Sequence, residues 1–182
     1  MEFLCIDIMN SSWNDYLGRK TQDRLDNPAW VAELLEKYGC SVEEPFDAEW
    51  IAELKELRGR MKETTQKIID GHGLEKASLE YINDYLSRTS HRYLIEQKET
   101  GPVLSSIPLE SGKDRILGQI ALSFAQLLTG KDLRRIKSCK NPDCRWIFYD
   151  ESKNRNKCWC ESKTCGNLMK VRNFRERKKL QG

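Results

Sequence analysis

The sequence lacks several features that mark common classes of protein. It has no apolar run approaching 18 residues, so we expect no membrane-spanning helix. Its first ten residues, MEFLCIDIMN, do not place a basic segment before an apolar one, so we expect no secretion signal and a cytoplasmic protein. It has only two histidines, no glycine-rich phosphate loop and no HExxH string, and these absences remove the usual signs of a nucleotide-dependent or zinc-dependent enzyme.

The few polar groups that might support catalysis do not form a recognisable set. His72 lies between two glycines in a predicted turn and His91 begins a predicted strand, and neither has a Cys or Ser partner at a catalytic spacing. Asp7 and Asn10 form a polar pair at the end of an apolar segment, where they can cap a neighbouring helix or line a pocket. We favour the capping role, because short polar side chains there commonly satisfy loose backbone groups. We predict no enzymatic activity.

Charge and cysteine content divide the chain into two parts. The net charge is +3 over 182 residues, but residues 1–130 carry 15 basic against 22 acidic residues, and residues 131–182 carry 16 against 6. The second part therefore has a balance of +10, which predicts a polyanionic partner. Five of the seven cysteines also lie there, within 27 residues. We expect an acidic domain at 1–130 and a basic domain at 131–182.

The acidic part is predicted to be an α+β domain dominated by helices. Residues 3–9 read as a mostly buried strand, and Asn27-Pro28 and Asp47 read as helix starts. Glu99-Thr100-Gly101-Pro102 reads as the turn of a hairpin. The expected elements are a strand at 3–9, helices at 28–38, 47–70, 75–87 and 113–128, and hairpin strands at 92–98 and 103–108.

The cysteines of the basic part are spaced for one metal ion. Cys139 and Cys144 enclose four residues, fifteen residues follow, and Cys160 and Cys165 again enclose four. Two such pairs can place four thiolates tetrahedrally around one Zn²⁺, which would supply the folding free energy that so small a module lacks. Cys158 is the uncertain member, because alternation on a strand would put it on the same face as Cys160.

The elements expected around these cysteines describe a treble-clef zinc finger. Asn141-Pro142-Asp143 provides a turn in the first pair, residues 145–150 and 157–159 read as hairpin strands, and Cys165 opens the last helix. On that helix Leu168, Val171 and Phe174 share an arc that we expect to pack inward. The basic and amide side chains that remain are candidates for contact with nucleic acid: Lys153, Arg155, Lys157, Asn167, Lys170, Arg172, Asn173, Arg175, Arg177 and Lys178.

These residues resemble a known family. The string from Cys139 to Asp150, the Ser152-Lys-Asn-Arg155 segment and Cys165-Gly166-Asn167 are similar to the CGNR-type zinc finger, and Leu4–Asn10 is similar to the start of the ABATE domain. The resemblance implies zinc bound by the four paired cysteines, a DNA-facing role for Asn167 and the basic residues after it, and a role as a stress-related transcription regulator. One position departs, because Leu168 stands where the family string has arginine.

The sequence therefore predicts a bacterial transcription regulator that binds duplex DNA through its zinc finger. Its first domain is expected to sense a small-molecule effector or to form a homodimer, with the long helix at 47–70 as a candidate partner surface. Two alternatives remain open. One is an RNA-binding zinc protein, which exposed aromatic residues on the hairpin of the finger would favour, and the other is an enzyme with a pocket in the first domain.

Overall fold

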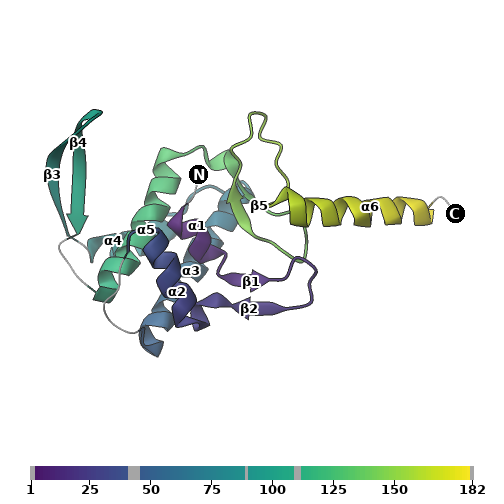
Figure 1. Ribbon diagram of the computed structural model, residues 1–182, viewed down its shortest axis with the longest axis horizontal. Helices are drawn as coiled ribbons and strands as arrows, with labels where there is room; N and C mark the ends of the chain where they lie inside the picture. The colour runs from purple at the N-terminus through teal and green to yellow at the C-terminus, as the bar shows by residue number, and fades with distance from the viewer. Residues whose placement is uncertain (1–2, 41–45, 89, 109–111, 181–182) are drawn as a thin grey trace.

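The computed structural model describes residues 3–40, 46–88, 90–108 and 112–180 (Figure 1). Helices dominate the first part of the chain, and three separate two-stranded antiparallel sheets accompany them. The helices are α1 (Leu4–Met9), α2 (Pro28–Lys37), α3 (Ala48–Ile69), α4 (Lys76–Ser87), α5 (Gly112–Gly130) and α6 (Asn167–Leu180). The strands are β1 (Ser12–Asn14), β2 (Thr21–Asp23), β3 (His91–Lys98), β4 (Gly101–Pro108), β5 (Ile136–Ser138) and β6 (Ile147–Tyr149). The α+β class dominated by helices is confirmed.

The segment predicted as a strand at 3–9 is instead helix α1, so that prediction was wrong. Five of its six residues are buried, and it packs against α3 and α5. A short apolar run cannot be assigned to helix or strand from its pattern alone. Where no strand lies alongside to pair with, a helix satisfies the buried backbone groups within the segment.

The predicted starts of the next two helices are confirmed. The Asn27 side chain accepts hydrogen bonds from the backbone N–H groups of Ala29 and Trp30, and Pro28 is the first residue of α2. The Asp47 side chain accepts from the N–H of Trp50 at 2.7 Å and caps α3. Both caps satisfy donors that have no partner inside the helix.

The core lies between α1, α3, α4 and α5. Helix α5 contributes eight buried residues to this core, and Phe124 and Leu117 are fully enclosed. On α4 the buried residues are Ile82 and Tyr85, whereas Leu79 is exposed. Among the described residues, no helix combines the length and the apolar composition that crossing a bilayer requires.

The described residues of the first part of the chain form two hairpins, and only one of them was predicted. Strands β3 and β4 form the expected hairpin and pair from His91 opposite Pro108 to Lys98 opposite Gly101. The turn is shorter than predicted, because Gly101 and Pro102 belong to β4. The shorter β1–β2 hairpin was missed because each strand has only three residues. It extends beside the zinc-finger segment, where its tip contacts the cysteine loop.

The basic part follows a different path from the one predicted. Strand β6 lies within the segment expected to be extended, but it pairs with β5, and residues 157–159 form no strand. Cys158 and Cys160 therefore do not share a strand face. Ile136 and Ile147 belong to the same buried cluster as the helices, so β5 and β6 join the finger to the main core.

Helix α6 projects from the body, and the inward packing expected of it was wrong. Val171 is 47% exposed and Phe174 is 62% exposed. A module of this size covers only the first turns of a fourteen-residue helix, so the later apolar side chains have nothing to pack against.

Candidate metal centre and nucleic-acid interface

The four paired cysteines converge on one point. The Sγ atoms of Cys139, Cys144, Cys160 and Cys165 all lie within 4.8 Å of one another. The Sγ atoms of Cys144 and Cys160 are 3.6 Å apart, and those of Cys160 and Cys165 are 3.7 Å apart. Four sulfur donors and no open position suit one tetrahedral, structural Zn²⁺. Cys158 lies outside the cluster, and its Sγ donates to the carbonyl of Asn156.

Local backbone geometry brings the first pair together. Cys139 directly follows β5, and the turn after it closes when the N–H of Cys144 donates to the carbonyl of Asn141 at 3.0 Å. Arg145 has a φ of 54°, an uncommon left-handed conformation for a residue other than glycine. This conformation redirects the chain into β6 immediately after the second cysteine.

Asn141 ties this turn to two other parts of the molecule. It is fully buried, and its Nδ2 donates to the carbonyl of Tyr16 at 2.9 Å in the β1–β2 hairpin. The same Nδ2 lies 3.4 Å from the Sγ of Cys165. At the hairpin tip, a Cβ built on Gly18 would lie 2.9 Å from the Asp143 side chain, and the φ of Gly18 is 73°. Only glycine suits this contact.

The close approach of the four cysteine side chains favours the binding of a cation. Thiol hydrogen bonds from Cys144 and Cys160 lower the pKa of Cys139, and the same crowding raises the pKa of Cys144 and of Cys160. Four thiolates cannot be held this close without a compensating positive charge, and a divalent ion held by these four cysteines would supply it.

Small apolar contacts support the second pair. Cys165 lies in a π-helical turn, Ser162–Gly166, that leads directly into α6. A Cβ on Gly166 would lie 3.2 Å from the Trp159 ring, so this glycine lets the ring pack closely beside the cluster. Phe148, Cys139, Cys144 and Cys165 form a second, smaller buried cluster, and the partly buried Trp159 packs against it.

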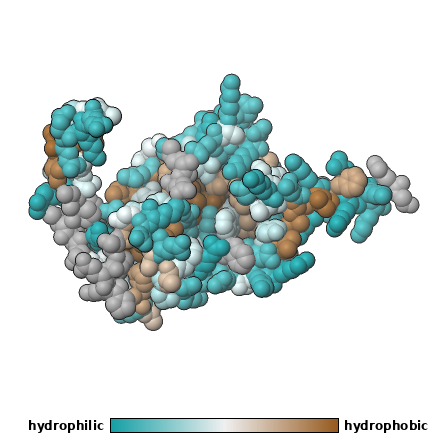
Figure 2. Space-filling view, viewed as in Figure 1, coloured by the Kyte–Doolittle hydropathy of each residue, from teal (hydrophilic) through white to brown (hydrophobic). Residues whose placement is uncertain are grey.

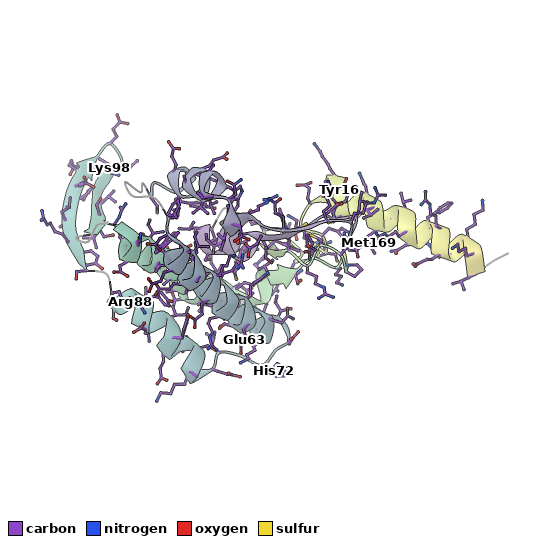
Figure 3. All side chains as sticks on the ribbon, turned by 90° about the horizontal axis from the view of Figure 1, so that it is seen from below. Tyr16, Glu63, His72, Arg88, Lys98 and Met169 are labelled. Carbon is purple, nitrogen blue, oxygen red and sulfur yellow. The ribbon has the colours of Figure 1, made fainter. Side chains whose placement is uncertain are left out.

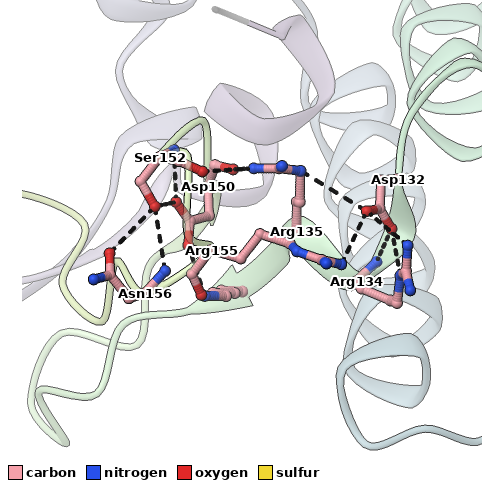
Figure 4. A network of polar contacts seen from close by, with 8 residues as sticks. Asp132, Arg134, Arg135, Asp150, Ser152, Arg155 and Asn156 are labelled. Atoms are coloured by element: carbon pink, nitrogen blue, oxygen red, sulfur yellow. Dashed lines mark hydrogen bonds and ion pairs between the residues drawn. The ribbon is translucent and has the colours of Figure 1, made fainter.

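A buried carboxylate organises the loop between the two cysteine pairs (Figure 4). The fully buried Asp150 accepts hydrogen bonds from Lys137 Nζ at 2.6 Å and from the backbone N–H groups of Ser152 and Lys157. Burial would raise the pKa of the Asp150 carboxyl, but the hydrogen bonds from Lys137 and Ser152 outweigh it and hold that pKa well below its ordinary value. Arg135 donates hydrogen bonds to the backbone carbonyls of Asp150 and Ser152. Arg135 and Lys137 therefore stabilise the conformation of this loop.

Two family models match the chain. One, described as CGNR zinc finger, matches residues 135–178. The other, ABATE, carries the description "Putative stress-induced transcription regulator" and matches residues 2–131, well over half of the chain. The chain belongs to the ABATE family. No curated protein matches it. The resemblance inferred from the residues is thus confirmed, together with the zinc finger.

The structure divides the predicted nucleic-acid residues of this ABATE protein into two groups. The first group is exposed on α6 or on the loop after Asp150: Lys153, Asn167, Lys170, Asn173, Arg175, Arg177 and Lys178. The second group has structural contacts: Arg172 pairs with Asp143 at 2.6 Å, Arg155 pairs with Asp132 at 3.4 Å, and Lys157 lies over the Phe148 ring. Within the first group, Asn167 and Arg177 also donate to backbone carbonyls one turn earlier.

Sequence reasoning missed the basic residues of the β1–β2 hairpin. Arg19 and Lys20 are exposed near the tip that contacts Asn141 and Asp143. Figure 3 shows Tyr16 of this hairpin beside the start of α6, near Met169. Because acidic residues outnumber basic ones in residues 1–130, the net charge of that segment gave no indication of these two basic side chains. The Gly18-Arg19-Lys20 turn was the only signal available.

Asp7 and Asn10 line a cavity of about 380 Å³. Neither side chain caps a neighbouring helix, the role we had favoured, although the Asn10 side chain does satisfy backbone groups, namely those of Ile147. The Asp7 carboxylate accepts from Lys37 Nζ at 3.0 Å and from the Tyr38 hydroxyl at 2.8 Å. Trp146 of the finger also lines the cavity, which therefore lies where the helical part meets the zinc finger. The lining residues are Asp7, Asn10, Arg24, Trp30, Glu33, Leu34, Lys37 and Trp146.

The one histidine whose side chain is described gives no support to a catalytic role. His72 is exposed in the turn after α3, and the side chain of His91 lies outside the described residues. The matched families are regulator and zinc-finger types rather than enzymes.

Proposed function

We propose that this ABATE protein is a cytoplasmic transcription regulator that binds duplex DNA through its zinc finger, with α6 as the principal contact. The single observation that carries this proposal is the projection of α6 from the body with its basic side chains exposed. A single helix of this kind fits the major groove of B-form DNA.

The charge of the finger supports a polyanionic partner. Binding one Zn²⁺ through four thiolates changes the balance of residues 131–182 from +10 to about +8, so the segment stays strongly basic. On α6 itself, Glu176 is the only acidic residue. Lys153, on the loop after Asp150, and Lys163, in the π-helical turn before α6, are exposed and widen the basic surface. Contacts of this kind to phosphates supply much of the affinity for DNA.

The zinc centre fixes the position of the first turn of α6. Cys165 lies two residues before the helix, and the ion pair from Arg172 to Asp143 holds the second turn against the cysteine loop. A recognition helix must keep its register on the duplex, so rigid attachment at one end supports a DNA-reading role. Removing zinc would release both restraints together.

The aromatic residues of the finger favour duplex DNA over single-stranded RNA. Phe148 is buried and Trp146 and Trp159 are half-buried, so the finger does not present the row of stacking faces that RNA modules use. Phe174 on α6 is the one large aromatic side chain of the finger that is exposed. RNA binding is therefore the second candidate.

We also propose that the cavity beside Trp146 is an effector site. It is lined from both α2 and the finger, so a ligand there would contact the two parts that a regulator must couple. Trp30→Ala and Trp146→Ala variants should lose the thermal stabilisation that an effector produces in the unaltered protein.

The DNA proposal is tested by fluorescence anisotropy with a labelled duplex of mixed sequence at low salt. Arg175→Ala should weaken binding severalfold, because Arg175 is exposed on α6. Lys76→Ala is the matched control, since it removes one exposed charge from α4 and should leave binding unchanged. Tighter binding to a single-stranded RNA of the same sequence would favour the second candidate, and equal losses in both variants would contradict an α6 interface.

A further inference from the structure

The β1–β2 hairpin is held at both ends. At its base, Arg58 of α3 donates two hydrogen bonds to the Asp23 carboxylate, both at 2.7 Å. At its tip, Asn141 of the cysteine loop donates to the carbonyl of Tyr16 at 2.9 Å. Two strands of three residues would not by themselves hold the connecting turn in one position. The hairpin is therefore an arm that extends from the helical core and ends on the zinc finger.

The turn of this hairpin presents two adjacent basic side chains. Arg19 and Lys20 are both exposed. The acid of the turn, Asp15, is half-buried, and its Oδ1 accepts a hydrogen bond from the N–H of Leu17 at 3.0 Å. The exposed charge of the turn is therefore positive, although residues 1–130 as a whole are acidic.

Asp143 joins this tip to the start of α6. A Cβ on Gly18 would lie 2.9 Å from the Asp143 side chain, so the hairpin backbone runs directly against that carboxylate. Arg172, in the second turn of α6, pairs with the same carboxylate at 2.6 Å. This ion pair compensates the negative charge between the two elements. The basic tip therefore lies beside the second turn of α6.

The side of α6 that faces the tip is also basic. Arg175 and Lys179 follow Arg172 by three and seven residues, so they lie on the same side of the helix, and both are exposed. Glu176 is the one acid there. Figure 2 shows hydrophilic side chains along this helix, interrupted by a few apolar ones. The combined surface, here named the tip–helix surface, consists of Arg19, Lys20, Arg175 and Lys179.

The dimensions of B-form DNA assign the tip to the phosphate backbone. An α-helix with its side chains is about 10–12 Å across, and the major groove is about 12 Å wide, so a helix in the groove fills it. An element that lies beside the helix, as the hairpin tip does, then meets the phosphates that border the groove and not the base edges. Phosphate contacts fix the orientation of a protein on the duplex without reading its sequence.

We propose that the tip of the β1–β2 hairpin is a second DNA-contacting element, in which Arg19 and Lys20 bind phosphates beside the groove that α6 occupies. This role rests on the proposed DNA-binding function and adds a contact from outside the matched zinc-finger segment, residues 135–178. Because the arm is already held at both ends, little ordering entropy is lost when the two side chains bind. The helical part of the chain thus takes part in DNA binding directly.

Salt dependence tests this contribution. In competition titrations with a duplex of mixed sequence, Arg19→Ala combined with Lys20→Ala should flatten the salt slope by about 1.8, because each phosphate contributes about 0.9. Binding to a second duplex of unrelated sequence should weaken by the same factor. An unchanged slope, or a loss confined to one of the two duplexes, would overturn the proposed phosphate contact.

The matched control is Arg60→Ala combined with Lys76→Ala. It also removes one arginine and one lysine from exposed positions, but these lie on α3 and α4, away from α6 in Figure 1. The control should leave the slope unchanged. Equal flattening in the two double variants would show that only net charge matters and would overturn the role of the tip.

Arg175→Ala separates this role from the DNA proposal itself. If Arg175→Ala weakens binding and the tip variant does not, α6 binds DNA without the hairpin, and only the role of the tip is refuted. If the unaltered chain does not bind the duplex at all, both proposals are refuted. Weaker binding in both variants, with the control unchanged, supports both.

Lysine acetylation provides a second test on the unaltered protein, so its result does not depend on how a variant folds. Adding the duplex to the zinc-loaded protein should slow the reaction of Lys20 and Lys179 with an N-hydroxysuccinimide ester several-fold. Lys76 on α4 should react equally with and without DNA. Mass spectrometry of the peptides measures the modified fraction at each lysine. Protection of Lys179 without protection of Lys20 would overturn the role of the tip and leave the α6 contact standing.

Discussion

The side-chain amide of Asn10 brackets the backbone of Ile147. Its Oδ1 accepts from the Ile147 N–H at 2.9 Å, and its Nδ2 donates to the Ile147 carbonyl at 2.8 Å. Asn10 ends α1, and Ile147 begins β6, so one side chain completes the hydrogen bonding of a strand 137 residues away. This contact attaches the zinc finger to the helical core.

Asn10→Ala should therefore destabilise the protein. It leaves the N–H and C=O of Ile147 without their partners, and unsatisfied buried groups of this kind cost roughly 1–3 kcal/mol. Urea unfolding measures the loss. Asn83→Ala, on the exposed side of α4, is the matched control and should change the free energy of unfolding by less than about 0.5 kcal/mol. Equal effects for the two variants would show that the hydrogen bonds between Asn10 and Ile147 contribute nothing to the free energy of unfolding.

Zinc content should depend on Cys160 and not on Cys158. The unaltered protein should contain one Zn²⁺ per chain, and Cys160→Ser should lose most of it, because a neutral hydroxyl replaces one of four thiolates. Cys158→Ser should keep full occupancy, since its Sγ lies outside the cluster. Mass-spectrometric metal analysis of the purified variants provides the measurement. Full zinc in Cys160→Ser would refute this set of four ligands.

Chelation should unfold the finger while α2 to α5 stay folded, as two domains at 1–130 and 131–182 predict. Hydrogen exchange should show lost protection at Cys139, Cys144 and the start of α6, with protection retained at Leu54 and Phe124 in the main core. Because Asn141 holds the carbonyl of Tyr16, the β1–β2 hairpin should also exchange faster. Simultaneous loss of protection in α5 would show that the chain is one cooperative unit.

The ion pair between Asp23 and Arg58 predicts a pH-dependent contribution to stability. Burial would raise the pKa of Asp23, but the bidentate hydrogen bonds from Arg58, both at 2.7 Å, lower it below its ordinary value. A carboxyl whose pKa is lowered by folding contributes stability above its unfolded pKa of about 4, and loses it as the pH falls toward the folded value. Asp23→Asn should cost roughly 2 kcal/mol at pH 7.

The test compares the free energy of unfolding, measured in urea, between Asp23→Asn and the unaltered protein. The difference should narrow as the pH falls from about 5 to about 3, because protonation of Asp23 then removes the same charge. Asp70→Asn, in an exposed position at the end of α3, should show little effect at any pH. A constant difference would mean that the charge of Asp23 is not what stabilises this contact.

If α6 binds phosphates, affinity for DNA should fall linearly with the logarithm of salt concentration, by about 0.9 per phosphate neutralised. Four to six phosphates would give a slope of about −4 to −5. Arg177→Ala should flatten the slope by about one unit if Arg177 meets a phosphate. A loss of about 1–3 kcal/mol confined to particular sequences would instead assign it to a guanine edge. Competition titrations at two salt concentrations distinguish these outcomes.

Much of the local structure was readable from single residues. Asn27 with Pro28 and Asp47 marked helix starts, because their side chains satisfy backbone donors within the same turn. The cysteine spacing indicated one zinc site, because thiolate chemistry and chain length restrict where four sulfur atoms can meet. In each case both partners of the interaction lie close together in the sequence.

Tertiary structure decided what depended on distant partners. The sequence alone determined the charge division, the four cysteines that suit one zinc ion and most helix boundaries, since these follow from composition, spacing and short-range hydrogen bonding. It did not determine that Leu4–Met9 would form a helix, that β6 would pair with β5, or that α6 would leave Val171 and Phe174 exposed. The physical reason is that a short apolar segment satisfies its backbone and buries its surface with whatever lies beside it, and only the folded chain decides what that is.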